Sequence, residues 1–163
     1  MRTSTVLAVL SVVLGGLACN STTGVQNNFG AVLSDYYEVP ADTSTGRATA
    51  TFVVNGLTIN YTLNITAAAA SNYTAAHIHT GVTGVSGPVR VTLCGSSPAC
   101  PTGTGTVAGT FTADSLNMPL GSPAPITYAA LVTALRARGA YVNVHSATHT
   151  GGEIRGQIFP TEQ

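Results

Sequence analysis

Apolar and polar residues alternate in short runs along most of the chain, and residues typical of turns separate these runs. In 57–66, apolar residues at every second position from Leu57 to Ile65 alternate with threonine and asparagine. Alternate side chains of a strand point to opposite faces of its sheet, so this run predicts a strand with one buried face. The dipeptide Asn55-Gly56 just before it is the strongest hairpin signal in the chain. Similar runs predict further strands at 29–34, 46–55, 74–80, 87–93, 105–113, 140–145 and 153–159.

One segment has helical instead of alternating spacing. Leu131 and Leu135 lie four residues apart, which places them on one face of a helix. Thr127 is placed to cap its N-terminus and Gly139 to end it. We therefore expect one short helix between two of the predicted strands. Many short strands with turn residues between them are the pattern of a β-sandwich or barrel.

The first residues predict export from the cell. Arg2 precedes the apolar run 6–17, which is too short to span a bilayer comfortably and reads as part of a signal peptide. The run ends in Gly16-Leu17-Ala18-Cys19, which resembles the lipobox of bacterial lipoproteins. That resemblance implies a signal peptide at 1–18, acyl chains on Cys19 that anchor the protein to a membrane, and a polar tether at 19–28. The alternative is ordinary signal-peptide cleavage and secretion.

The location expected from these residues is the cell envelope. Asn20 follows the cysteine where the lipoprotein family has aspartate for retention in the inner membrane. This favours the outer membrane, the periplasm or the cell surface. Cys94 and Cys100 remain as an even pair in an oxidising compartment, which predicts a disulfide across their Gly/Pro-containing loop.

Charge excludes one class of partner. Charged residues make up 7% of the chain, with six basic and six acidic side chains. A protein that binds nucleic acid needs a basic surface to neutralise phosphates, and this sequence offers none. We therefore expect no nucleic-acid partner.

Two segments together resemble the chordin-type CHRD domain. One contains His77-Ile78-His79-Thr80-Gly81, and the other contains Tyr141-Val142-Asn143-Val144-His145 followed by Gly152-Glu153-Ile154-Arg155-Gly156-Gln157-Ile158. The resemblance covers roughly 29–159 and implies an exported β-sandwich, in a family usually without an assigned reaction. We expect an all-β domain at 29–160, an immunoglobulin-like or superoxide-dismutase-like Greek-key β-sandwich or barrel with one short helix before the last hairpin.

Strand periodicity places the histidines of these segments on one face. His77 and His79 alternate with Ala76 and Ile78, and His145 alternates with Val144. If the two segments are neighbouring strands, the three imidazoles gather on the face opposite the core. Imidazole binds copper and zinc well, so the pattern predicts a metal site.

The fourth ligand of such a site has two candidates, Glu153 and His149. The stretch around His77 and His79 is also similar to the first copper-ligand strand of copper-zinc superoxide dismutase. The zinc-binding loop of that enzyme has no counterpart here, so catalysis is disfavoured.

The alternative is a buried polar network without a metal. Asn143, Glu153, Arg155 and Gln157 would share the histidine face, with Glu153 paired to Arg155 or to a protonated histidine. The sequence contains no complete catalytic set. It favours a non-catalytic binding or structural module at the cell envelope, with an envelope or extracellular partner. The alternative function is a copper- or zinc-binding envelope protein that uses His77, His79 and His145.

Overall fold

The computed structural model describes residues 25–116 and 126–161 of the 163-residue chain. The predicted signal peptide at 1–18, the predicted lipidation site Cys19 and the first part of the predicted tether lie outside the described residues. Within the described ranges, no helix has both the length and the apolar character needed to cross a membrane.

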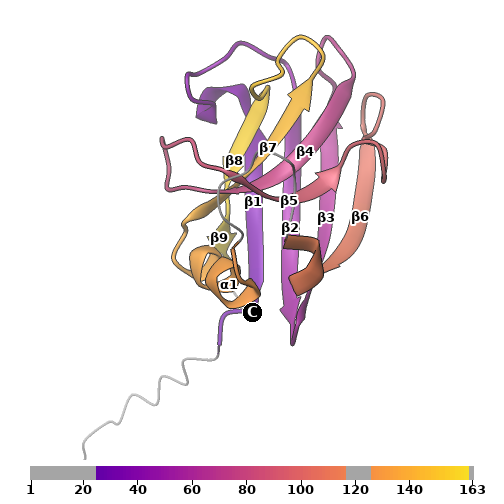
Figure 1. Ribbon diagram of the computed structural model, residues 1–163. Coiled ribbons are helices and arrows are strands. Elements are labelled where there is room, and N and C mark those ends of the chain that lie inside the picture. The colour runs from indigo at the N-terminus through magenta and orange to yellow at the C-terminus, as the bar shows by residue number, and fades with distance from the viewer. Residues whose placement is uncertain (1–24, 117–125, 162–163) are drawn as a thin grey trace, which may run out of the picture.

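The described chain consists mainly of antiparallel strands, which confirms the all-β prediction (Figure 1). The strands are β1 (Asn28–Ser34), β2 (Arg47–Asn55), β3 (Thr58–Ala67), β4 (Tyr73–Thr80), β5 (Val89–Cys94), β6 (Gly105–Thr112), β7 (Ala140–Ser146), β8 (Ile154–Gln157) and β9 (Phe159–Pro160). The helices are η1 (Asp35–Tyr37), η2 (Ala113–Leu116) and α1 (Tyr128–Arg136).

The strands form one strongly curved sheet in the order β5-β4-β7-β8-β1-β2-β3-β6, and β9 adds to β1. Its two ends, β5 and β6, come together, so the sheet is a nearly closed barrel or sandwich. The helix α1 precedes β7 and β8, as predicted. β4 lies beside β7, although a long stretch of chain separates them, and this neighbour relation positions the candidate site (Figure 1).

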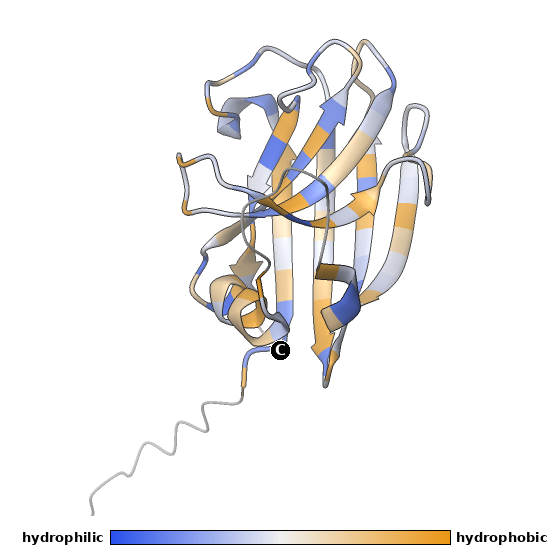
Figure 2. Cartoon of the chain, in the orientation of Figure 1, coloured by the Kyte–Doolittle hydropathy of each residue, from blue (hydrophilic) through white to orange (hydrophobic). Residues whose placement is uncertain are grey.

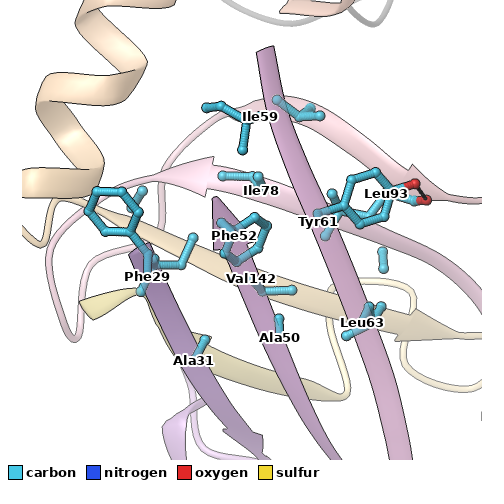
Figure 3. Packing of buried hydrophobic residues seen from close by; sticks show 14 of the residues in the cluster. Phe29, Ala31, Ala50, Phe52, Ile59, Tyr61, Leu63, Ile78, Leu93 and Val142 are labelled. Carbon is cyan, nitrogen blue, oxygen red and sulfur yellow. Dashed lines mark hydrogen bonds between the residues drawn. The ribbon is translucent and has the colours of Figure 1, made fainter. Parts of the chain in front are cut away.

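Alternation of polar and apolar residues builds the core. The bands of hydropathy in Figure 2 follow the strands, with one apolar side chain in every two. In β2 and β3 every second residue is buried. Figure 3 shows side chains from both halves of the sheet meeting in the interior, including Phe52, Leu63 and Val142. Each fully buried apolar side chain contributes about 1.5–3 kcal/mol to folding, so this core is the main source of stability.

The first hairpin differs from the prediction by one residue. The strands pair Asn55 with Thr58, so the two-residue turn is Gly56-Leu57, not Asn55-Gly56. Gly56 has a φ of 61°, which a glycine adopts at little cost at the first central position of such a turn. Leu57 is therefore 77% exposed at the tip of the hairpin, and the prediction that it continues the buried row was wrong.

The helix begins as predicted and ends differently. Thr127 caps it, because its hydroxyl oxygen accepts a hydrogen bond from the Ala130 N–H. At the other end Gly139 N–H donates to Ala134 O and Arg138 N–H to Leu135 O, which is a Schellman motif. The residue in the left-handed conformation is Arg138, with a φ of 57°, and not Gly139.

The last predicted strand, 153–159, is divided. β8 pairs with β7, whereas β9 pairs with Phe29 and Gly30 of β1. Ile158 between them is fully buried in the core. The predicted disulfide joins Cys94 to Cys100 and closes the loop after β5.

Candidate metal centre

Strand pairing brings three histidines together. In the β4–β7 register His77 lies opposite Asn143, His79 opposite Tyr141, and Ala75 opposite His145. Ala76 and Ile78, which alternate with the two histidines of β4, are fully buried in the core. The imidazoles therefore lie on the opposite face of the sheet, as the sequence predicted.

The three imidazoles are close enough to share one ion. One ring nitrogen from each of His77, His79 and His145 lies within 4.8 Å of the others. His77 Nδ1 and His145 Nε2 are 3.1 Å apart. In a tetrahedral zinc site with nitrogens about 2.0–2.1 Å from the metal, two ligand nitrogens are about 3.3 Å apart. The His77–His145 pair already has about this spacing, and separations of up to 4.8 Å within the cluster would shorten by at most about 1.5 Å around an ion.

Backbone carbonyls orient two of the rings. A carbonyl oxygen only accepts, so the Nδ1–H of His79 donates to Gly87 O at 2.8 Å, and that of His145 donates to Thr150 O at 3.0 Å. Each ring then keeps its lone pair on Nε2. Histidines that bind metals usually donate their other N–H in this way, which fixes both tautomer and orientation.

One of these lone pairs has no partner among the described residues. His79 Nε2 is buried and makes no hydrogen bond within this part of the chain. A buried acceptor without a partner costs about 1–3 kcal/mol, and a bound ion would remove that cost. His77 Nδ1 in turn donates to the lone pair of His145 Nε2 when no ion is present.

Burial keeps the imidazoles neutral. It lowers the pKa of His77 to about 4, and the neighbouring histidines add to the effect. It also lowers the pKa of His79 to about 4, although the hydrogen bond to Gly87 acts in the opposite direction. Desolvation lowers the pKa of His145 as well. Neutral imidazole is the form that binds metal ions, so the cluster is ready for coordination near neutral pH.

An aromatic ring forms one wall of the cluster. Tyr141 stacks on His79, with ring centroids 4.8 Å apart and an interplanar angle of 11°. The guanidinium carbon of Arg155 lies 3.4 Å from the centroid of the same ring. The His79 ring and the Arg155 guanidinium group cannot share one face of the Tyr141 ring, so each covers a different face. Tyr141 therefore separates the charge of Arg155 from His79. Its hydroxyl oxygen accepts a hydrogen bond from Gly87 N–H at 3.0 Å.

The structure does not bring the two candidate fourth ligands into this group. Glu153 is almost completely buried and accepts a hydrogen bond from the Ser44 hydroxyl at 2.7 Å. His149 lies 3.1 Å from an Asp42 carboxylate oxygen and 3.7 Å from one of Glu153. The loop before β8 thus turns both side chains toward the segment after η1, away from the three histidines.

The predicted polar network is buried, but its members contact other residues instead of one another. Asn143 donates to Glu38, and Gln157 donates to three backbone carbonyls. Arg155 donates to the carbonyls of Val82 and Val85. The predicted pair of Glu153 with Arg155 is absent from the ion pairs of the described residues. Glu153 instead accepts from Ser44, and Arg155 donates to the loop between β4 and β5.

Two contributors to the site were not predicted. These are Tyr141, whose ring stacks on His79, and Gly87, whose carbonyl oxygen accepts the Nδ1–H of His79. A Cβ on Gly87 would lie 1.7 Å from Thr80 O, so only glycine allows its carbonyl to reach His79. The Gly87-Pro88 pair after His77 and His79 was the available signal for this close approach.

Comparison with known proteins gives one finding about family. The model of the CHRD domain family matches residues 29–158. The comparisons with curated proteins and with solved structures find no match.

Proposed function

The chain belongs to the CHRD domain family, and from that premise we propose that it is a non-catalytic envelope module that binds one copper or zinc ion through His77, His79 and His145. The cluster of three imidazole nitrogens within 4.8 Å of one another carries this proposal. Its support comes from the arrangement of donors, because family membership alone is consistent with any binding or structural role.

The donor set favours copper or zinc over hard cations. Imidazole nitrogen suits zinc and copper, whereas calcium and magnesium prefer oxygen ligands. Three protein ligands leave one coordination position for water or for a partner's side chain. His79 and His145 would bind through Nε2, and His77 through Nδ1 in the tautomer that carries its proton on Nε2.

Metal analysis of the purified full chain tests the proposal. Bound metal is first removed from the protein with a chelator. The protein is then incubated with copper or zinc and desalted, and its metal content is measured by elemental mass spectrometry. We expect a single ion per chain, and a loss of affinity of about 10–100-fold or more for His79→Gln and His145→Gln. His149→Gln is the matched control, because this histidine lies outside the cluster and the variant is expected to bind as the wild type does.

Two outcomes contradict the metal proposal. One is the absence of stoichiometric copper and zinc from a folded wild-type protein. The other is equal loss of metal in His149→Gln and His79→Gln, which would place the ion elsewhere. In either case the three imidazoles serve as a hydrogen-bonded polar cluster.

The proposed envelope location rests on separate observations. The apolar run 6–17 and the segment Gly16-Leu17-Ala18-Cys19 support export and lipidation, and the Cys94–Cys100 disulfide is typical of an oxidising compartment. Intact mass and membrane fractionation test this part. We expect the native protein to begin at an acylated Cys19, and Cys19→Ser to leave the membrane fraction. A membrane-bound Cys19→Ser protein would contradict the anchor without affecting the metal proposal.

A further inference from the structure

A pocket of about 570 Å³ lies on the outer side of the sheet, where the Tyr141 ring separates its Arg155 from the histidine cluster. Its floor is the outward face of β1 and β2, where Gly30 is paired with Thr51 and Val32 with Thr49. β8 and β9 form one wall, and Tyr37 of η1 lies at the rim. The loop joining β4 to β5, which projects from the barrel in Figure 1, contributes Thr83 and Gly84.

The lining of this pocket is mainly apolar. Val32 is 66% exposed and Phe159 is 41% exposed, although both are large hydrophobic side chains. Tyr37 adds a half-exposed ring. Pockets of about 300–1,000 Å³ with apolar walls and few polar groups are typical of small-molecule sites. Three of the exposed apolar side chains therefore lie where a small ligand would cover them.

One buried cation lines the pocket. Arg155 is 2% exposed, and one of its terminal nitrogens donates to Val82 O and Val85 O. It takes part in none of the ion pairs formed by the described residues. Glu38 interacts with it electrostatically without forming an ion pair, and burial raises the pKa of this carboxyl group. A buried guanidinium group without a paired carboxylate is costly, and an anion in the pocket would compensate it.

The side-chain amide of Gln157, which also lines the pocket, has no donor to spare. Gln157 uses its amide N–H groups on the carbonyls of Gly81, Arg138 and Ala140. Arg155 is thus the charged donor available to a ligand, because guanidinium carries five N–H groups and only one of its nitrogens has hydrogen-bond partners among the described residues. Guanidinium is also the side chain best matched to a carboxylate.

We propose that this pocket binds a small amphipathic acid, with its apolar body over Val32 and Phe159 and its carboxylate on Arg155. The proposal is independent of the metal proposal, since it uses a different set of side chains. Recognition would combine burial of apolar surface with one charge-assisted hydrogen bond.

Calorimetric titration of the full chain with octanoate and with octan-1-ol tests this proposal, with chelator present to exclude metal effects. Both probes have the same apolar chain, but only octanoate carries a charge. We expect one octanoate per chain, bound at least about tenfold more tightly than octan-1-ol, because a hydrogen bond to a charged group contributes about 1.5–3 kcal/mol. Arg155→Gln is expected to abolish this preference.

A second pair of variants keeps the test valid if Arg155→Gln fails to fold. Thr51→Trp places a large side chain on the pocket floor at an exposed position, and it is expected to weaken octanoate binding at least tenfold. Ala108→Trp is the matched control on β6, also exposed but outside the pocket. Three results would overturn the proposal: no octanoate binding, equal affinity for both probes in the wild type, or equal weakening by both tryptophans.

Discussion

At the scale of the residue, the second nitrogen of each ring determines what the imidazole can do. The carbonyl oxygens of Gly87 and Thr150 each accept a hydrogen bond from the Nδ1–H of one histidine. The other nitrogen of each ring is therefore unprotonated. Burial then prevents protonation of the free nitrogen, because a charged ring would lose its hydration. The cluster is therefore a set of neutral acceptors whose protonation opposes folding.

This opposition predicts a loss of stability in mild acid. The pKa of His77 and of His79 is about 4 in the folded protein, against 6.5 as the ordinary value. The unfolded chain binds more protons between these values, so stability is complete above pH 6.5 and falls as the pH drops toward 4. Both rings retain some contact with solvent, so we expect only about 1–2 kcal/mol lost between pH 7.5 and pH 5 in metal-free protein.

Urea denaturation at the two pH values measures this loss. The double variant His77→Gln/His79→Gln is the reference, because carboxyl groups such as Asp35 and Glu38 titrate alike in both proteins. Its stability should change less between pH 7.5 and pH 5 than that of the wild type. Equal changes in the two proteins would show that the imidazoles do not carry the effect.

At the scale of the element, the loop that joins β4 to β5 serves both proposed sites. Gly87 orients His79, while the carbonyls of Val82 and Val85 accept hydrogen bonds from Arg155. Tyr141 of β7 contacts His79 on one side and Arg155 on the other. The loop is held at several points by buried groups, so its conformation is fixed before any ligand arrives.

The end of α1 allows a direct prediction about stability. Arg138 adopts the left-handed conformation at the Schellman position that glycine usually occupies, at a cost of about 1 kcal/mol. We expect Arg138→Gly to stabilise the protein by up to about 1 kcal/mol, since only a partly exposed contact of its guanidinium with Phe159 is lost. Thermal unfolding measures the gain.

A matched glycine substitution within the helix separates this local effect from a general one. Ala129 is exposed in the first turn of α1, with ordinary helical backbone. Ala129→Gly should cost about 0.5–1 kcal/mol. If Arg138→Gly destabilises as much as Ala129→Gly, the left-handed residue is not the strained element.

The sequence predicts an element well when the interactions that determine it join residues close together along the chain. Thr127 and the alternation in β3 were sufficient, because a cap and a strand face depend on near neighbours along the chain. The exact turn at Gly56-Leu57 was missed, because the register between β2 and β3 selects it. The contacts of Arg155 with Val82 and Val85 could not be predicted either, since they join strand β8 to a loop whose position the sequence pattern leaves open.

At the scale of the whole molecule, the candidate centre depends on strand order. The histidine face could be predicted from periodicity, but the proximity of His77 to His145 requires β4 and β7 to be neighbours. The pairing of β4 with β7 is part of the strand order of the whole barrel. In that order β1 pairs with β2 on one side and with β8 and β9 on the other, and so joins the two groups of strands. No local motif encodes it.

One buried hydrogen bond joins the two groups of strands across the core, and its removal measures how much it contributes to the free energy of unfolding. The hydroxyl of Tyr61 on β3 donates to Leu93 O on β5 at 2.7 Å, the dashed line in Figure 3. Tyr61→Phe keeps the ring and leaves the Leu93 carbonyl without this donor, so we expect a loss of about 1–3 kcal/mol in urea unfolding. Tyr128→Phe is the control: its hydroxyl also donates to carbonyls, those of Gly56 and Thr58, but water can replace it there. The control should lose less than about 1 kcal/mol of stability. Equal losses in the two variants would mean that the Tyr61–Leu93 hydrogen bond contributes no more than a hydrogen bond at the surface.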